Sequence, residues 1–192
     1  MRRFQRGEAR AFETLMHRHR TPVYAFLLRL TGERTRAEDL VQETFLRLVK
    51  ASAGWEPRAA VRTWLFTIAR NLAVDASRRQ VFRAAEPLDA PGPDGEGQRH
   101  PPPAATGPAP DEAAEAARLR PRLEAALAVL PADQREVVLL REHAGLSFPE
   151  IAEAVGVNEN TAKSRMRYAL LALRERLAAE GIVAGPQGRT TP

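Results

Sequence analysis

Residues 84–115 constrain the fold of this chain more than any other segment. They hold eight of the 15 prolines and four of the 12 glycines, and Leu88 is their one large apolar side chain. Such a composition cannot bury enough apolar surface to offset the entropy lost on ordering. We therefore predict a disordered linker at 84–115, two domains at 1–83 and 116–180, and a flexible tail at 181–192.

Charge is distributed unevenly over these segments. Residues 1–83 carry 17 Lys/Arg against 8 Asp/Glu, the linker carries 1 against 7, and residues 116–192 carry 11 against 9. The formal net charge of +5 favours a polyanionic partner. Because the chain has no cysteine, thiolate zinc sites are excluded. No apolar run is long enough for a membrane span or a signal peptide, so we expect a cytoplasmic protein.

Both domains show helical spacing of apolar residues and no alternating strand pattern. We therefore predict an all-α fold made of two small helical bundles. Thr35 and Glu38 have the spacing of a capping box, and Pro22 indicates a break or kink in the preceding helix. A helix after Pro57 is expected to bury one stripe of residues, namely Val61, Trp64, Leu65, Ile68, Ala69 and Leu72.

Residues 145–165 have the pattern of a helix-turn-helix. Ser147 and Glu150 form a capping box for its first helix, and Gly156 allows the tight turn to a second helix that begins near 158–160. The first turns of such a second helix face base edges in the major groove of DNA. The candidate DNA-reading residues are Asn160, Thr161, Lys163, Ser164, Arg165 and Arg167.

Asp39, Gln42 and Glu43 fall on one face of a predicted helix, because residues three and four apart are neighbours there. Two interpretations stay open for this face. It is either a solvated acidic surface or a docking surface for a basic partner helix.

A second set of polar residues lies on the helix that follows Trp55. Trp55 itself lies in a glycine-containing loop. An exposed aromatic side chain beside cations suits stacking on unpaired bases, but Trp55 could equally cap the bundle core. The cations either follow a phosphate backbone or form a solvated basic face. They lie off the apolar stripe of their helix at Arg62, Arg70, Arg78 and Arg79.

Catalytic chemistry finds little support in the sequence. His17 and His19 are two residues apart, so on a helix they point to different faces and cannot share a metal ion. No glycine-rich loop of the phosphate-binding kind is present. We therefore expect no enzymatic activity, no cofactor and no metal site.

Four motifs, in this order, resemble the extracytoplasmic-function (ECF) class of bacterial sigma factors. They are AEDLVQETFL at 37–46, RTWLFTIARN at 62–71, LPADQREV at 130–137, and the helix-turn-helix. The resemblance covers both domains. It implies a non-catalytic factor that joins core RNA polymerase, places the enzyme on a promoter and opens the DNA around the start site.

The resemblance also implies roles for individual residues. Asp39, Gln42 and Glu43 would face a basic coiled coil on the largest polymerase subunit. The single-stranded −10 element would be bound by Trp55, Arg62, Arg70, Asn71, Arg78 and Arg79. The duplex −35 element would be read by Asn160, Thr161, Lys163, Ser164, Arg165 and Arg167. An anti-sigma factor is the usual further partner.

The second helix departs from the family pattern at several positions. Asn160 and Ala162 replace the residues that the family often has there, and Tyr168 and Leu170 stand where its members are commonly basic. We therefore predict no −35 sequence. Two alternatives remain open: an ordinary helix-turn-helix repressor or activator, and a regulatory decoy that binds polymerase but not DNA.

Overall fold

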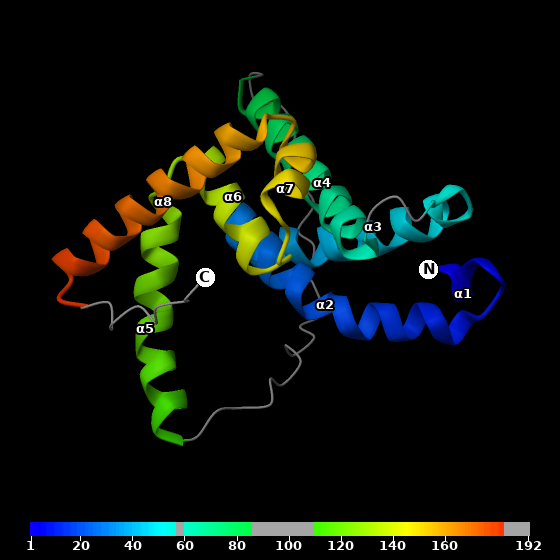
Figure 1. Cartoon of the computed structure of the whole chain (residues 1–192), viewed down its shortest axis with the longest axis horizontal. Coiled ribbons are helices and arrows are strands. Elements are labelled where there is room, and N and C mark those ends of the chain that lie inside the picture. The colour runs from blue at the N-terminus through cyan, green and yellow to red at the C-terminus, as the bar shows by residue number, and fades with distance from the viewer. Residues whose placement is uncertain (57–59, 86–109, 183–192) are drawn as a thin grey trace. The chain divides into compact units, whose positions relative to one another are not determined.

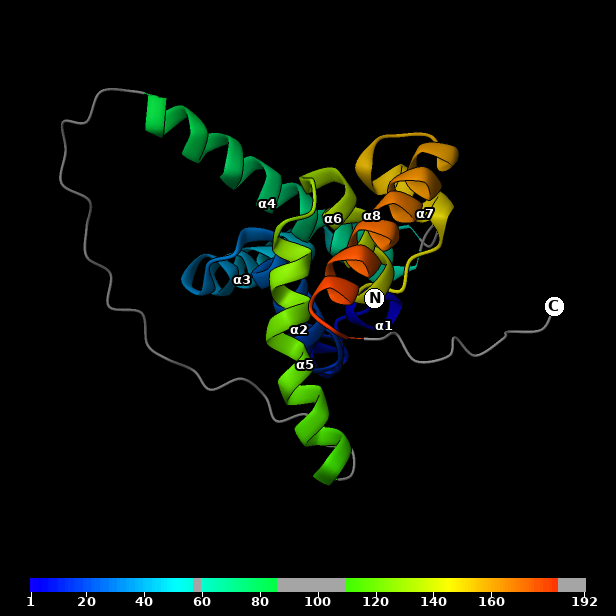
Figure 2. The ribbon, with the colours of Figure 1, turned by 90° about the vertical axis from the view of Figure 1, so that its left-hand side faces the viewer.

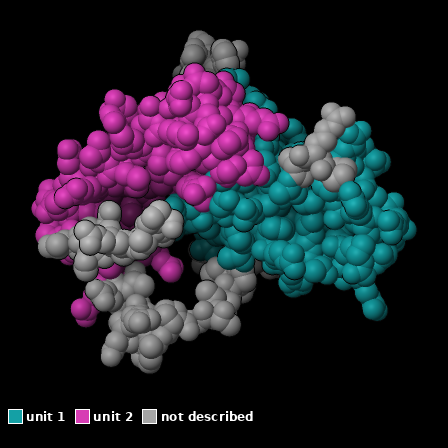
Figure 3. Space-filling view, in the orientation of Figure 1, with its two compact units in different colours: residues 1–104, 142–146 teal, residues 105–141, 147–192 magenta. Residues whose placement is uncertain are grey.

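The computed structural model describes residues 1–56, 60–85 and 110–182. Eight α-helices and one short 3-10 helix form these parts of the chain, and no strand occurs among them. The predicted all-α fold is therefore confirmed. Two compact units contain residues 1–104 with 142–146 and residues 105–141 with 147–192 (Figure 3).

Three long helices form the first unit: α2 (Ala9–Thr31), α3 (Arg34–Ala51) and α4 (Val61–Ala85). Each of them contacts the other two (Figure 1). The short helix α1 (Arg2–Gln5) packs on α2, and the 3-10 helix η1 (Ser52–Gly54) follows α3. The rings of Phe26 and Phe66 meet edge to face in the core, with centroids 5.4 Å apart. The other large side chains fully buried here include Val23, Leu27, Leu48, Leu65 and Leu72.

The start of α3 differs from the predicted capping box of Thr35 and Glu38. Gly32 ends α2 in the left-handed region at φ 71°, and α3 begins at Arg34 with Glu33 as its N-cap residue. Thr35 therefore lies inside the first turn, and no side-chain bond caps the helix. The Glu38 carboxylate accepts a hydrogen bond from the Arg34 guanidinium at 3.1 Å instead. The predicted box is wrong.

Pro22 does not break α2, which runs as one helix from Ala9 to Thr31. Proline removes one backbone hydrogen bond from a helix interior. The helix continues because the residues directly after Pro22 are anchored in the core, where Val23, Phe26 and Leu27 are fully buried.

The buried face of α4 is wider than the predicted stripe. Half of that stripe is buried, namely Leu65, Ala69 and Leu72, and the other half is only partly buried, namely Val61, Trp64 and Ile68. Phe66 was not in the stripe and is fully buried. Because α4 contacts both α2 and α3, it buries adjacent positions such as 65 and 66, which a single stripe does not include.

The second unit contains α5 (Pro110–Ala128), α6 (Ala132–Glu142), α7 (Phe148–Val155) and α8 (Glu159–Ala179). The long helix α8 contacts both α5 and α7 (Figure 2). Its buried residues follow the helical period, at Ala162, Met166, Ala169 and Leu173. Ile151, Ala152 and Ala154 of α7 are buried as well.

The predicted linker and tail fall mostly outside the described residues. Helix α4 continues to Ala85 and α5 begins at Pro110, so helices take both ends of the segment 84–115. Residues 86–109 and 183–192 are not described, and the domain boundaries stay a prediction. None of the described helices is long and apolar enough to cross a membrane.

Candidate nucleic-acid interface

Helices α7 and α8 form the predicted helix-turn-helix. The Ser147 hydroxyl accepts the backbone N–H of Glu150 (3.5 Å), and the Glu150 carboxylate accepts the backbone N–H of Ser147 (2.8 Å). This capping box fixes the first turn of α7. Gly156 ends α7 at φ 73°, and the side-chain oxygen of Asn158 accepts the backbone N–H of Thr161 (2.7 Å). Local side-chain bonds therefore define where α8 begins.

One face of α8 is exposed along its first turns. Asn160, Ser164 and Arg167 are exposed and follow one another at spacings of four and three residues. Residues at these spacings lie above one another on a helix. We call these three residues the reading face. Because the opposite side of α8 is buried, the reading face is held toward solvent.

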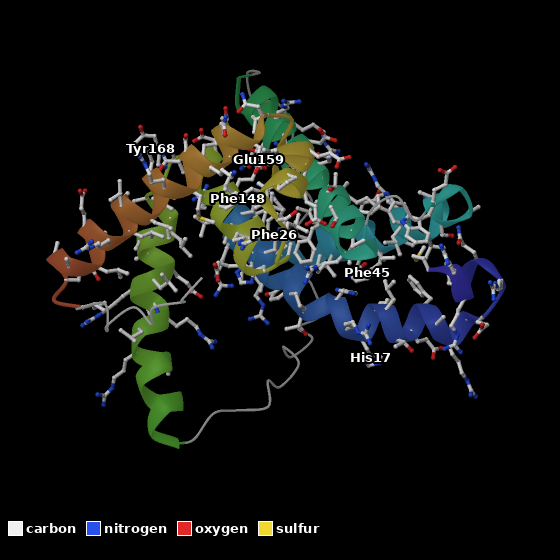
Figure 4. All side chains as sticks on the ribbon, viewed as in Figure 1. His17, Phe26, Phe45, Phe148, Glu159 and Tyr168 are labelled. Carbon is white, nitrogen blue, oxygen red and sulfur yellow. The ribbon has the colours of Figure 1, made fainter. Side chains whose placement is uncertain are left out.

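The other three predicted residues of α8 lie outside the reading face. Lys163 is exposed and forms an ion pair with Glu159, one turn earlier, at 2.7 Å (Figure 4). Arg165 forms an ion pair with Asp133 at the start of α6 (3.1 Å), and its side chain is 26% exposed. Thr161 is half-buried. The structure thus brings three of the six predicted residues together and ties Arg165 to a neighbouring helix.

The two positions of α8 that lack the expected charge are both exposed. Tyr168 is 52% exposed and Leu170 is 55% exposed. The guanidinium carbon of Arg167 lies 5.2 Å from the centroid of the Tyr168 ring. A cation at this distance is attracted to the ring face. Tyr168 therefore supports a cation of the reading face instead of supplying a charge.

Helix α3 carries the predicted acidic residues on its exposed side. Asp39 and Gln42 are exposed, and Glu43 accepts a hydrogen bond from Arg47 at 2.8 Å. This bond from Arg47 holds the pKa of Glu43 below its usual value, so the carboxylate stays ionised. We call Asp39, Gln42 and Glu43 the acidic face.

Leu46 belongs to the same side of α3, and the sequence did not point to it. It stands seven residues after Asp39 and is 54% exposed. The leucines on the other side of this helix, Leu40 and Leu48, are buried. In the sequence, only the angular position of Leu46 around the helix, relative to Asp39, could have distinguished it from the buried leucines.

The predicted polar residues of α4 do not gather on one face. Arg62 lies in the first turn and Arg78 sixteen residues later, about 24 Å along the helix axis. Asn71 and Arg78 share a side, whereas Arg79 lies about 100° around the axis from Arg78. Arg70 is half-buried, and its guanidinium donates to the side-chain oxygen of Asn71 at 3.2 Å. We call these five residues the basic track.

Trp55 directly follows η1 and is half-buried. Its ring centroid lies 6.5 Å from that of Trp64, and the two ring planes are tilted by 36°. The ring therefore covers part of the core at Trp64 and leaves part of its own surface accessible. Both interpretations of Trp55 given above are compatible with this position.

Comparisons with known proteins agree with the arrangement of these helices. The family described as Sigma-70 region 2 matches residues 15–83, and the family described as Sigma-70, region 4 matches residues 120–173. The ECF RNA polymerase sigma factor SigL of Mycobacterium tuberculosis is 37% identical over 178 residues, which cover 92% of this chain and 94% of that protein. The RNA polymerase sigma factor CarQ of Myxococcus xanthus is 36% identical over 181 residues, with coverages of 92% and 95%.

Two solved structures are also similar to this chain. The sigma factor RpoE of Bartonella quintana, in complex with the anti-sigma factor NepR, has a TM-score of 0.67 at 25% identity and covers 90% of this chain and 99% of its own. CnrH, in complex with the cytosolic domain of CnrY, has a TM-score of 0.63 at 26% identity, with coverages of 92% and 93%. The chain therefore belongs to the ECF sigma factors of the sigma-70 family, which act with RNA polymerase in the initiation of transcription.

Proposed function

We propose that this sigma factor docks on core RNA polymerase through the acidic face of α3 and binds promoter DNA through α4 and α8. It performs no covalent chemistry and acts in the cytoplasm. One observation carries the proposal: the first unit exposes an acidic face and a basic track on different helices, and the helix-turn-helix exposes a separate reading face. Surfaces of opposite charge suit two partners, one a protein and one a nucleic acid.

The acidic face meets the basic coiled coil of the largest polymerase subunit. Ionised Asp39 and Glu43 steer the partner and fix its orientation more than they add affinity, because they remain near solvent. Leu46 supplies the apolar part of the contact. Fully burying an exposed leucine side chain contributes about 1.5–3 kcal/mol. Leu46 is 54% exposed, so its burial contributes about half of that.

The basic track and Trp55 hold the unpaired −10 strand. Taking a base out of the duplex costs a few kcal/mol, and stacking on an aromatic ring returns about 1–3 kcal/mol per base. Arg62, Arg70, Arg78 and Arg79 add phosphate contacts at successive points along α4. Cations spaced along and around a helix can contact successive phosphates of a single strand that curves past the helix.

The reading face recognises the duplex −35 element. Asn160, Ser164 and Arg167 reach base edges in the major groove, where Asn and Arg side chains form paired hydrogen bonds with adenine and guanine. Lys163, Thr161 and Arg165 flank these residues and contact phosphates, which position the helix without reading sequence.

A protein inhibitor of the anti-sigma class is the further partner. RpoE, one of the similar solved proteins, is in complex with an anti-sigma factor. By this similarity we propose that an inhibitor also binds this chain and keeps it from the polymerase.

In vitro transcription tests the proposed function. Bacterial core polymerase is incubated with fragmented host genomic DNA, with and without this protein, and transcript starts are mapped. We expect discrete new starts that share two upstream elements. The double variant Asp39→Asn, Glu43→Gln should weaken polymerase binding and reduce these starts. Glu13→Gln, which removes an exposed carboxylate from α2, is the matched control and should behave like the native protein.

The alternatives give different results in the same experiment. Association with core polymerase without any new start would favour the regulatory decoy. If the protein neither associates with polymerase nor changes the starts, the proposal is wrong. A helix-turn-helix repressor would then be the better explanation, and it should bind a palindromic operator as a dimer.

A further inference from the structure

The first residues of the chain hold the loop that carries Trp55. The side-chain amide of Gln5 donates two hydrogen bonds, one to the backbone carbonyl of Ser52 (2.8 Å) and one to that of Trp55 (2.9 Å). The Trp55 backbone N–H donates to the same Ser52 carbonyl at 3.1 Å. Gln5 therefore binds both ends of η1, across 47 and 50 positions of sequence.

Packing of α1 keeps Gln5 in this position. The ring of Phe4 lies 5.2 Å from that of Phe12 on α2, and Phe12 lies 6.4 Å from Phe45 on α3. These ring contacts connect α1 directly to α2 and, through Phe12, to α3. Residues 1–14 precede the segment that matches Sigma-70 region 2, so the contact comes from outside the matched segment.

The loop that carries Trp55 is also held on the side of α3, where the buried Ser52 donates its hydroxyl to the Val49 carbonyl at 2.6 Å. A 3-10 helix has poorer hydrogen-bond geometry than an α-helix, and η1 is three residues long. The Trp55 ring is half-buried and only tilted against Trp64. The two bonds from Gln5 fix the backbone carbonyls at both ends of η1 and so bear on where the Trp55 ring points.

We propose that Gln5 is a positioning residue for promoter opening: through Ser52 and Trp55 it sets the Trp55 ring in the orientation that receives an unpaired −10 base. This inference rests on the proposed role of Trp55 in holding that strand. Gln5 itself contacts no DNA. Removing the amide donors of Gln5 should therefore weaken DNA binding only in a protein that still has Trp55.

Tryptophan emission gives a direct readout of the loop. The chain has two tryptophans, and Trp64→Phe leaves Trp55 as the single emitter. In that background we expect Gln5→Met, which keeps the side-chain length but cannot donate, to shift Trp55 emission to longer wavelength and to increase its quenching by acrylamide. Thr31→Val is the matched control, because it removes a hydroxyl that donates to a backbone carbonyl (Leu27, 2.8 Å) elsewhere in the unit.

Binding of single-stranded DNA gives the functional readout. The probe is the non-template −10 oligonucleotide of a promoter mapped by transcription, and the protein is the full chain bound to core polymerase. Trp55→Ala should weaken binding about 5- to 150-fold, the range expected for one stacked base. Gln5→Met should weaken it about three- to tenfold and should have no further effect in the Trp55→Ala background. Duplex −35 binding should be unchanged in both variants.

Each other outcome has a distinct meaning. If Trp55→Ala weakens binding but Gln5→Met changes neither emission nor binding, the inference is wrong and the role of Trp55 stands. Equal losses from Gln5→Met with and without Trp55 would also overturn it, since they would show that Gln5 acts elsewhere. If Trp55→Ala has no effect on binding, the proposed role of Trp55 fails and the inference fails with it. If Thr31→Val changed Trp55 emission and DNA binding as much as Gln5→Met does, the effect of Gln5→Met would be general destabilisation of the unit, and the inference would be wrong.

Discussion

The two helices with the predicted DNA-binding residues, α8 and α4, present them in different ways. On α8, three exposed residues share one face, opposite a continuous buried stripe. On α4, five residues wind around the helix over about 26 Å. Reading base edges requires side chains in fixed register, whereas binding a strand backbone requires charge along a path. The two arrangements therefore suit duplex recognition by α8 and single-strand binding by α4.

The largest expected effect is a loss of stability in Phe66→Ala, which tests whether the two units unfold independently. Phe66 is fully buried beside Phe26 in the first unit. Phe66→Ala should lower the free energy of unfolding of that unit by about 3–5 kcal/mol, because it leaves a cavity. Urea unfolding followed by tryptophan emission measures this, since both tryptophans belong to the first unit. Duplex −35 binding at low temperature should change little. If −35 binding were lost together with the stability of the first unit, the two units would fold as one cooperative body. The contrast between them would then not hold.

The next effect distinguishes residues within α8. Arg167→Ala should cost about 1–3 kcal/mol of −35 binding and relax base preference at one position. Arg165→Ala should cost less, and equally for all sequences, because this side chain is paired with Asp133. Binding of the polymerase complex to a duplex library, in which each base pair of the −35 element is varied, measures both. A stronger change of base preference in Arg165→Ala would contradict the proposed reading face.

The same contrast explains what the sequence could predict. The helix-turn-helix was predictable because its boundaries depend on local bonds, those of Ser147 with Glu150 and of Asn158 with Thr161. The pairing of Arg165 with Asp133 could not be predicted from the sequence, because Asp133 lies on another helix. The start of α8 was a local property, whereas the pairing of Arg165 depended on another helix.

In the first unit, the observed start of α3 and several tertiary contacts differ from what the sequence predicted. The pattern at Thr35 and Glu38 fits a capping box, but Gly32 lets α3 begin earlier. Phe66 lay outside the predicted stripe because α4 is covered by two helices, and Gln5 reaches its acceptors across about fifty residues. No periodicity within a window of sequence contains such contacts.

A pair of variants compares the predicted capping box that is present, at α7, with the predicted capping box that is absent, at α3. Ser147→Ala should lower the free energy of unfolding of the second unit by about 0.5–2 kcal/mol, because an occupied cap is lost. Thr35→Ala has the same motif spacing but no cap bond, so its effect should stay within about 0.5 kcal/mol. Thermal unfolding followed by circular dichroism compares the two. A loss in Thr35→Ala as large as that in Ser147→Ala would show that the box at α3 forms in solution.

The smallest expected effect tests the nature of the basic track. Arg78 is exposed on α4, and a residue that contacts one phosphate releases about one counterion on binding. Arg78→Ala should therefore reduce the slope of log K against log salt by about 0.7 for a single-stranded −10 oligonucleotide, with the same change for unrelated oligonucleotides. Arg118→Ala removes an exposed cation from α5 and should leave the slope unchanged. If Arg78→Ala instead changes sequence preference at constant slope, α4 reads bases as α8 does. The two helices would then differ in the strand that they bind and not in the way they bind it.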